Sequence, residues 1–371
     1  SQHYLLTAFM GNATNLLTPS ASDPSTWTLA RSIRTLKDQE NEILTNQTQL
    51  ALDTQLFGLP HQILGGVDLI HEKQNTWAYA GTGTLPAAKL YAPNPFDLVT
   101  GLNLVRNGAF TRGSTTTMST YIFDRIELNP AWAINTGIRL DHYNTDYSAA
   151  SLSTATSHPT LPVGTLVPLN LNSSGNLVNA KLGLVYKPSA NSSIYASTSS
   201  SKQPPGGSNF ALSTAANSAA NPKFDPQNTL NLELGAKLDL LDKKLSFNTA
   251  IYSTKISNDV VQDPVDLQYY QTGKKEVNGI ELSATGALTR DWLVSAGYAL
   301  MDTKVSSGPV VTASGMNNLS YTPKHSFTAW TSYTLPSGLN VGGGLRYVDS
   351  LLRGTDVFLG APTTTEIYTV M

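Results

Sequence analysis

Residues capable of covalent or metal chemistry are present in this chain, but their spacing assembles no catalytic set. His71 and Glu72 are adjacent on a predicted strand, where consecutive side chains point to opposite faces, so they do not share a metal ion. Neither the Gly-x-Ser-x-Gly motif of hydrolases nor the His-Glu-x-x-His motif of zinc proteases occurs. The six histidines lack metal-ligand spacing: His3, His61, His71, His142, His158 and His325. The sequence therefore predicts no catalytic residues, no metal site and no enzyme.

Composition narrows the class of protein. Of the 371 residues, 13% are charged, whereas about 25% is typical of a soluble domain. The net charge of −2 gives no electrostatic reason to expect nucleic-acid binding. No run approaches the roughly eighteen apolar residues that a membrane-spanning helix needs. A polar, weakly charged chain of this kind is still compatible with a membrane β-barrel, in which only every second residue faces lipid.

The elements that would position any functional side chain are strands with a period of two. In the segment 228–240, every even position from Leu230 to Leu240 is apolar, and the odd positions between them are Asn, Glu, Gly, Lys and Asp. This alternation puts the apolar side chains on one face of a strand and the charged ones on the other. We expect eight residues to face lipid: Leu230, Leu232, Leu234, Leu238, Ile280, Leu282, Trp292 and Val294.

The pattern recurs about a dozen times along the chain. Strands are predicted near 41–57, 61–73, 115–128, 131–146, 177–187, 192–202, 229–241, 244–256, 272–286, 291–303, 324–335 and 339–348, with weaker candidates at 3–10 and 26–38. Segments of about ten residues with this alternation are typical of membrane-spanning β-strands.

The connections alternate in length. Short ones are predicted near 129–130, 188–191, 242–243, 289–291 and 336–338, and long ones near 74–114, 147–176, 203–228, 257–271, 304–323 and after Asp349. Short turns at one end and long loops at the other are the arrangement of an outer-membrane barrel. Aromatic residues near strand ends suit the interfacial girdles of such a barrel: Trp132, Trp292, Tyr298, Tyr333 and Tyr347. A soluble propeller, the main alternative, would show a fixed repeat of about 40–50 residues, which the hairpins lack. The fold class is an all-β, transmembrane antiparallel β-barrel.

Several motifs follow one another in a specific order. They are Lys202-Gln203-Pro204-Pro205-Gly206-Gly207, Asp225-Pro226-Gln227, Glu233-Leu234-Gly235-Ala236-Lys237, Val277-Asn278-Gly279-Ile280-Glu281-Leu282, Trp292 to Tyr298, and Gly342-Gly343-Gly344-Leu345-Arg346-Tyr347. With these motifs, the chain resembles the barrel of TonB-dependent siderophore receptors, in particular the catecholate group, from about residue 4 to its end.

The resemblance implies a 22-stranded barrel whose lumen is filled by an N-terminal plug domain with a TonB box. We therefore expect 1–371 to be an incomplete barrel domain, without the plug and the last strands. The implied function is import of ferric siderophores across the outer membrane of a Gram-negative bacterium, energised by the TonB-ExbB-ExbD complex through the plug. Iron would be cargo, no cofactor is implied, and the receptor would be a monomer that contacts membrane lipid and lipopolysaccharide.

Two groups of site residues follow from the resemblance. A ferric catecholate is a flat aromatic anion, which cations neutralise and aromatic rings stack against. The candidates for ligand contact are Trp77, Tyr79, Tyr91, Arg106, Phe110, Arg112, Lys202, Tyr269, Tyr270, Tyr321 and Arg353. The candidates that face the plug across the lumen are Arg139, Asp141, Glu233, Lys237, Glu281 and Arg346. We expect the longest loop, 74–114, to contribute most to ligand binding through Arg106 and Arg112.

Two other functional classes remain open at this point. A passive porin-like channel would need no plug, and the Glu-Leu-Gly-x-Lys and Val-x-Gly-x-Glu motifs speak against it. A barrel enzyme, such as an outer-membrane protease or phospholipase, would need a catalytic set, which the sequence does not supply. A plug of about 130 residues carrying a TonB box would distinguish the receptor from both.

Overall fold

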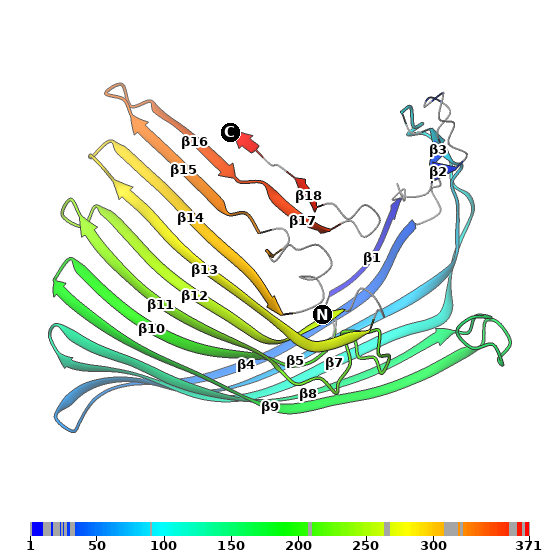
Figure 1. Ribbon diagram of the computed structural model, residues 1–371, viewed down its shortest axis with the longest axis horizontal. Helices are drawn as coiled ribbons and strands as arrows, with labels where there is room; N and C mark the ends of the chain where they lie inside the picture. The colour runs from blue at the N-terminus through cyan, green and yellow to red at the C-terminus, as the bar shows by residue number, and fades with distance from the viewer. Residues whose placement is uncertain are drawn as a thin grey trace.

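The computed structural model describes residues 2–9, 16–17, 23, 25, 28–29, 34–89, 91–206, 210–262, 268–307, 318–319, 322–355, 362–365 and 368–370. Within these residues, one antiparallel sheet of 14 strands has the order β1-β4-β5-β7-β8-β9-β10-β11-β12-β13-β14-β15-β16-β19. Figure 1 shows that this sheet is strongly curved and that strands which follow one another in the chain lie side by side. Two small sheets, β2-β3-β6 and β17-β18, lie within the connections.

Ten of the fourteen strands in the large sheet, β4, β5 and β7–β14, exceed the roughly 9–11 residues that a strand needs to cross a bilayer. Their bounds are β1 (Gln2–Phe9), β4 (Arg34–Leu56), β5 (Leu59–Thr84), β7 (Thr100–Asn129), β8 (Trp132–Leu152), β9 (Leu166–Ser189), β10 (Ser192–Gln203), β11 (Gln227–Leu240), β12 (Leu245–Gln262), β13 (Tyr269–Ala287), β14 (Trp292–Ser307), β15 (His325–Thr334), β16 (Asn340–Val348) and β19 (Tyr368–Val370). The remaining strands are β2 (Leu16–Leu17), β3 (Thr28–Leu29), β6 (Ala88–Lys89), β17 (Leu351–Thr355) and β18 (Pro362–Thr365).

The predicted short turns are confirmed, and they gather along the left edge of the sheet in Figure 1. The long connection predicted at 203–228 is also confirmed, since β10 ends at Gln203 and β11 begins at Gln227. On a barrel of this kind, the edge with short turns is the periplasmic one. The opposite ends of the strands are therefore extracellular.

Three predicted loops are largely strand, and in one of them, 257–271, β12 takes 257–262 and β13 takes 269–271. The segment 74–114 belongs mostly to β5 and β7, which leave only 85–99 as a connection containing β6, and the segment 147–176 shrinks to a connection at 153–165. The pairing of β5 with β7 shifts register after Trp77 and after Ala80, and Gly81 and Gly83 have φ values of +70° and +69°. Each bulge inserts unpaired residues and breaks the period of two, so the continuing ladder is hidden from a sequence pattern.

The pairing register puts the two predicted sets of residues on opposite faces of the sheet. Leu234 pairs with Ile251, and Ile251 pairs with Ile280; cross-strand partners share a face. Following these pairs through β14 puts all eight residues of the predicted lipid-facing set on one face. Glu233, Lys237 and Glu281 occupy alternate positions and lie on the other. We call the first the outward face and the second the inner face.

The outward face carries a belt of exposed apolar side chains. Leu50, Val67, Met118, Ile122 and Ile138 are between 43% and 71% exposed, and they share this face on β4, β5, β7 and β8. An apolar area of this extent marks a surface that contacts lipid or protein rather than water. Among the described residues, no helix is long and apolar enough to cross a membrane.

Candidate functional site

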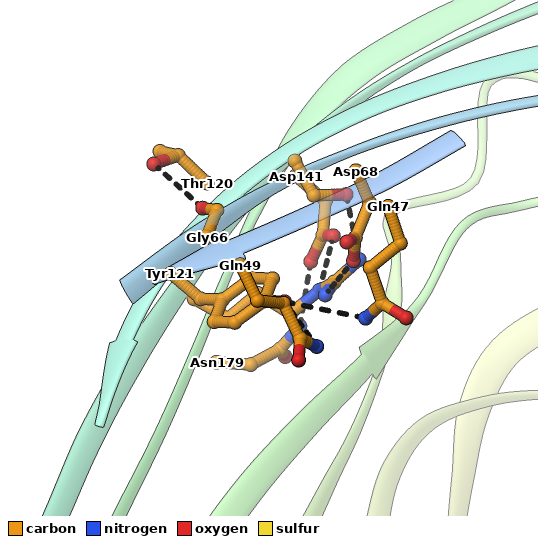
Figure 2. Close-up of polar contacts among 10 residues, drawn as sticks. Gln47, Gln49, Gly66, Asp68, Thr120, Tyr121, Asp141 and Asn179 are labelled. Atoms are coloured by element: carbon orange, nitrogen blue, oxygen red, sulfur yellow. Dashed lines mark hydrogen bonds and ion pairs between the residues drawn. The ribbon is translucent and has the colours of Figure 1, made fainter. Parts of the chain in front are cut away.

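The most connected polar cluster lies on the inner face, where Arg139 of β8 meets Asp68 of β5. The guanidinium nitrogens of Arg139 lie 2.6 Å from Asp68 Oδ2 (Nη1) and 2.7 Å from Asp141 Oδ1 (Nε). Its Nη2 also donates a hydrogen bond of 2.7 Å to Ser119 Oγ. Asn179 Nδ2 donates to the remaining Asp141 oxygen at 3.1 Å. Four neighbouring strands thus supply one continuous network (Figure 2).

Strand register, rather than sequence proximity, brings this network together. Asp141 pairs with Ser119, and Ser119 pairs with Asp68, so the three side chains stand in a row across β8, β7 and β5. Arg139 is two residues from Asp141 on the same face and reaches both carboxylates. Asp68 and Asp141 are 8% and 9% exposed at their side chains, and such charges are stable there only because they are paired.

Beside Arg139, the ring of Tyr121 lies flat on the wall. Gln47 Nε2 and Gln49 Nε2 donate hydrogen bonds to its hydroxyl at 3.2 and 2.9 Å. A Cβ atom placed on Gly66, its cross-strand partner, would lie 2.5 Å from the ring, so only glycine fits beneath it. Figure 2 shows Tyr121, Gln47 and Gln49 on one side of the strands and Thr120 on the other. The alternation predicted from the sequence is thus directly visible.

A second inner-face cluster is built by the two glutamates of the sequence motifs. Tyr195 donates a hydrogen bond of 2.5 Å to Glu233 Oε1, and the Lys237 ammonium lies 5.9 Å from the centre of the Tyr195 ring. Glu233 and Glu281 border a hollow of about 400 Å³ whose other lining residues, Asn248 among them, carry no charge. Fixed carboxylates in such a hollow suit a cationic or hydrogen-bond-donating group that enters the lumen.

All six residues predicted to face the lumen lie on this inner face. Arg139, Asp141, Glu233, Lys237 and Glu281 were placed above. Arg346 of β16 shares a face with Lys237 of β11, because an unbroken series of cross-strand pairs connects them. The series runs from Arg346 through Thr328, Gly297, Ser283 and Asn248 to Lys237. Sequence reasoning missed Asp68, Ser119, Tyr121, Gln47 and Gln49, whose contacts depend on the register. The period of two does put them on the polar face, and that was the available signal.

The predicted ligand contacts in 74–114 are arranged differently from expectation. Arg106 pairs with Tyr79 across β5 and β7, and its Nη2 lies 2.7 Å from Asp38 Oδ2 on β4. Tyr79 donates to the same oxygen at 2.7 Å, and the Arg106 guanidinium lies 4.2 Å from the Trp77 ring centre. Hydrogen bonds with Tyr79 and Asp38 raise the pKa of Arg106 above its ordinary value.

This cluster faces outward, away from the lumen. Asp38 pairs with Trp77, and Trp77 pairs with Phe110. Asp38 and Phe110 occupy even-numbered positions of β4 and β7, and so have the same parity as the outward residues Leu44 and Met118. Arg112 shares that parity, and its guanidinium lies 4.6 Å from the Phe110 ring centre. The expectation that Arg106 and Arg112 lie in a long loop is therefore corrected, since both belong to β7. They lie on strands, and Arg106 is committed to the buried carboxylate of Asp38, which is 1% exposed.

Four of the remaining ligand candidates have described side chains, and they lie at strand ends or in a connection opposite the short turns. Tyr91 is exposed between β6 and β7, Lys202 lies near the end of β10, and Tyr269 and Tyr270 begin β13. Tyr270 pairs with Val261 and is 43% exposed. Tyr321 and the side chain of Arg353 lie outside the described residues.

Near Tyr270, the extracellular end of the inner face carries a charged group that the sequence did not reveal. Lys275 Nζ lies 2.6 Å from Asp259 Oδ2, and Gln227 Nε2 donates to Asp259 Oδ1 at 2.7 Å. The pairing of β12 with β13 shifts register on both sides of Asp259. The sequence pattern is broken at these bulges, which is why no periodic signal pointed to the group.

Three histidines in the described part of the chain each contact a single polar side chain. His61 contacts Asp124 at 2.7 Å, His71 contacts Thr116 at 2.8 Å, and His142 contacts Asn176 at 2.9 Å. Within the described part of the chain, no group of three or more His, Cys, Asp or Glu residues could hold a metal ion. The inner-face clusters can hold and release a polar partner by hydrogen bonds and ion pairs.

Comparison with known proteins agrees with this architecture. Residues 4–369 match the family described as TonB dependent receptor-like, beta-barrel. The chain is 38% identical over 378 residues to the catecholate siderophore receptor Fiu of Escherichia coli K12, covering 100% of this chain and 49% of that protein. It is 30% identical to the probable TonB-dependent siderophore receptor PiuA of Acinetobacter baumannii, over 63% of this chain and 31% of that protein.

Solved structures show the same fold. The closed form of the ferric-catecholate import receptor Fiu from E. coli K12 superposes with a TM-score of 0.87 at 37% identity, over 98% of this chain and 52% of that one. The A. baumannii receptor PiuA superposes with a TM-score of 0.71 at 23% identity, over 91% and 50%. The chain thus spans about half the length of the relatives it matches. It belongs to the TonB-dependent receptor β-barrel family, whose siderophore receptors lie in the outer membrane of Gram-negative bacteria.

Proposed function

We propose that this chain forms part of an outer-membrane receptor that imports ferric siderophores, of the catecholate type, by TonB-coupled active transport. The observation that carries the proposal is the 38% identity to a catecholate siderophore receptor along the whole chain. The fold adds support, because its polar inner face and apolar outward face suit a wall between lipid and a polar lumen.

The chain would supply 14 strands of a larger closed barrel. In lipid, each backbone group without a hydrogen-bond partner costs several kcal/mol, so a spanning sheet has to close on itself. The sheet ends at β1 and β19, and its relatives are about twice as long. We therefore propose that further strands join these two edges and that a plug domain fills the lumen. The complete receptor would be a monomer.

The inner face would hold the plug in place. Glu233 and Glu281 border a hollow that suits a cationic side chain of the plug, while Arg139, Asp141, Lys237 and Arg346 supply further polar contacts. The TonB-ExbB-ExbD complex would act on the plug and weaken these contacts, opening a path. The wall would act through hydrogen bonds and ion pairs, which can break and re-form during each transport cycle. The iron is cargo.

The siderophore would first meet the extracellular mouth. Tyr269 and Tyr270 begin β13 at the end of the sheet that carries the Asp259–Lys275 pair, and their aromatic rings suit stacking against a catecholate. Tyr91, Lys202, Tyr321 and Arg353 remain candidates as well. Of the sequence-derived set, Trp77, Tyr79, Arg106, Phe110 and Arg112 are the less suitable members, since they form an outward-facing group.

The test measures iron uptake and ligand binding in cells that produce the complete receptor. Dissipating the proton-motive force should abolish uptake of the ferric catecholate, whereas equilibrium binding to the cell surface should persist. A receptor lacking its plug serves as the comparison for passive flow. Uptake that continues unchanged in uncoupled cells would favour the porin-like channel and contradict the proposal.

A further inference from the structure

The motif Asp225-Pro226-Gln227 lies where the β10–β11 connection enters β11. Backbone pairing of β11 with β12 ends at Asn228 and Ser257, so it does not include the motif. A side chain from β13 binds the motif instead. Gln271 reaches across β12 to Asp225: its Oε1 accepts from the backbone N–H at 2.9 Å, and its Nε2 donates to the backbone carbonyl at 2.5 Å. These bonds join residues that are 46 positions apart in the chain.

An irregular part of the β12–β13 ladder makes this reach possible. The register shifts on both sides of Asp259, and Asn258, which precedes it, has a φ of +57°. Asparagine adopts this left-handed conformation more readily than most residues. The Asn258 carbonyl accepts a third bond from Gln271 Nε2 at 3.1 Å, and Asn258 Nδ2 donates to the Pro226 carbonyl at 3.3 Å. One glutamine thus joins β13, β12 and the segment before β11.

A charged group holds the same joint from the inner face. Asp259 accepts a hydrogen bond from Gln227 through Oδ1 and contacts Lys275 Nζ through Oδ2, so it links the start of β11 to β13. Its side chain is 10% exposed, and a carboxylate is stable there only when it is paired. A Cβ on Gly273 would lie 2.8 Å from Asp259 Cβ, so glycine leaves the space that Asp259 needs.

The β10–β11 connection is folded and rests on β13. Within it, the Ser213 N–H donates to the Ala220 carbonyl at 3.0 Å, and the Tyr269 N–H of β13 donates to the Ala216 carbonyl at 2.9 Å. Leu212 and Ala220 are 3% and 9% exposed. Further strands or a plug can only lower these values, so the burial is a property of this chain. The described part of the connection and the start of β13 therefore form one unit.

This unit places a cation and an aromatic residue at the extracellular end of the inner face. Lys275 alternates with Glu281 on β13 and shares its face. Tyr270 pairs with Val261, which lies two positions from Asp259 and on the same face. By the register, four other lysines near the extracellular ends of strands face outward: Lys73, Lys202, Lys255 and Lys304.

We propose that Gln271 and Asp259 clamp the β10–β11 connection to β12 and β13, and that they act as positioning residues for ligand recognition. The clamped rim holds Lys275 and Tyr270 at the mouth of the lumen, where they contact an anionic ferric catecholate by charge and by aromatic stacking. The catecholate rests on the proposed transport function, whereas the clamp is a property of the fold. The two can therefore fail separately.

The first test measures hydrogen exchange in the complete receptor. Gln271→Met keeps the length of the side chain and removes its hydrogen bonds. The amides of Ser213 and Tyr269 are not bonded to Gln271, yet they should exchange about tenfold faster, because the bonds that hold the whole connection in place are lost. The control, Gln55→Met at the periplasmic end of β4, should leave both amides unchanged. Unchanged exchange in the Gln271 variant would overturn the clamp.

The second test measures affinity for two tripodal iron(III) complexes, an anionic tris-catecholate and a neutral tris-hydroxamate. Lys275→Met should weaken binding of the catecholate about tenfold and of the hydroxamate much less, because only the anion gains from a charge-assisted contact. Lys275→Arg keeps the charge and should bind like the wild type. Gln271→Met should also weaken catecholate binding, while its urea midpoint for unfolding stays near that of the wild type, which separates positioning from loss of the fold.

Two outcomes decide between the parts of the proposal. Equal catecholate affinity in the wild type, Lys275→Met and Gln271→Met would overturn the role of the clamp in recognition. A wild-type receptor that binds neither complex, while Gln271→Met still accelerates exchange, would contradict the proposed ligand class and support the clamp.

Discussion

Arg139 and Asp68 form an ion pair of 2.6 Å across two strand boundaries, although 71 residues separate them in the chain. The pair depends on β7, which lies between their strands and contributes Ser119 to the same guanidinium. Arg139 also binds Asp141, so a single guanidinium serves two nearly buried carboxylates. Three strands, β5, β7 and β8, therefore contribute side chains to one guanidinium.

Removing the guanidinium should therefore destabilise the barrel. Arg139→Met leaves Asp68 and Asp141 nearly buried without their cation, and breaking such pairs costs about 3 kcal/mol or more. Urea-induced unfolding of the complete receptor from lipid vesicles would measure the loss. The triple variant R139M/D68N/D141N serves as the control, because it removes the charges together and should lose less. If the single variant were as stable as the triple one, the network would not have the role assigned to it.

Glycines beneath aromatic rings should tolerate no side chain. A Cβ on Gly235 would lie 2.4 Å from the ring of Tyr195, whereas one on Gly297 or Gly343 would meet nothing within 4 Å. Gly235→Ala should cost about 1–3 kcal/mol from overpacking, while Gly297→Ala and Gly343→Ala should be nearly neutral. Comparing the three unfolding midpoints checks this. Similar losses at all three positions would show that strand propensity, not the covering ring, decides the effect.

The two faces of β10 and β11 should respond in opposite ways to charge. Leu234→Arg puts a cation on the lipid-facing side and should cost about 2–4 kcal/mol at mid-bilayer depth. Ser197→Arg puts the same residue on the inner face, where its cross-strand partner is Glu233, and should be tolerated. Folding yield in vesicles and unfolding free energy would both report the difference. Tolerance of Arg at position 234 would mean that the register is wrong.

Arg106 should matter for the extracellular ends of the strands more than for ligand affinity. Arg106→Leu removes the cation that binds Asp38 on β4, so hydrogen exchange of the backbone near Asp38 and Tyr79 should accelerate. Affinity for a ferric catecholate should change little, because the cluster faces outward. Arg112→Leu is the control, since its contact is the Phe110 ring rather than a buried carboxylate. A large loss of affinity in the Arg106 variant, without faster exchange, would restore it as a ligand contact.

Much of the architecture follows from the sequence, because the period of two is a local property. Each strand needs one face for lipid and one for the lumen. The faces of residues such as Leu234 and Glu233 can therefore be predicted from the strand's own sequence, whichever strand it pairs with. Short turns interrupt the alternation with residues such as Asn129 and Pro130, and the turn positions could be read directly. The family motifs also lie within these strands, which is why the sequence indicated the receptor family.

Contacts between strands were decided only by the tertiary structure. The Arg139–Asp68 pair requires the register of β5, β7 and β8, and a sequence pattern contains no information on which residue of one strand stands opposite which residue of the next. Arg106 faces outward because β5 and β7 continue as paired strands through bulges. The alternation of apolar and polar residues fails at these bulges, so the sequence pattern predicted a loop where the structure has paired strands. Local alternation thus determined the side of each residue, and long-range hydrogen bonding determined its neighbours.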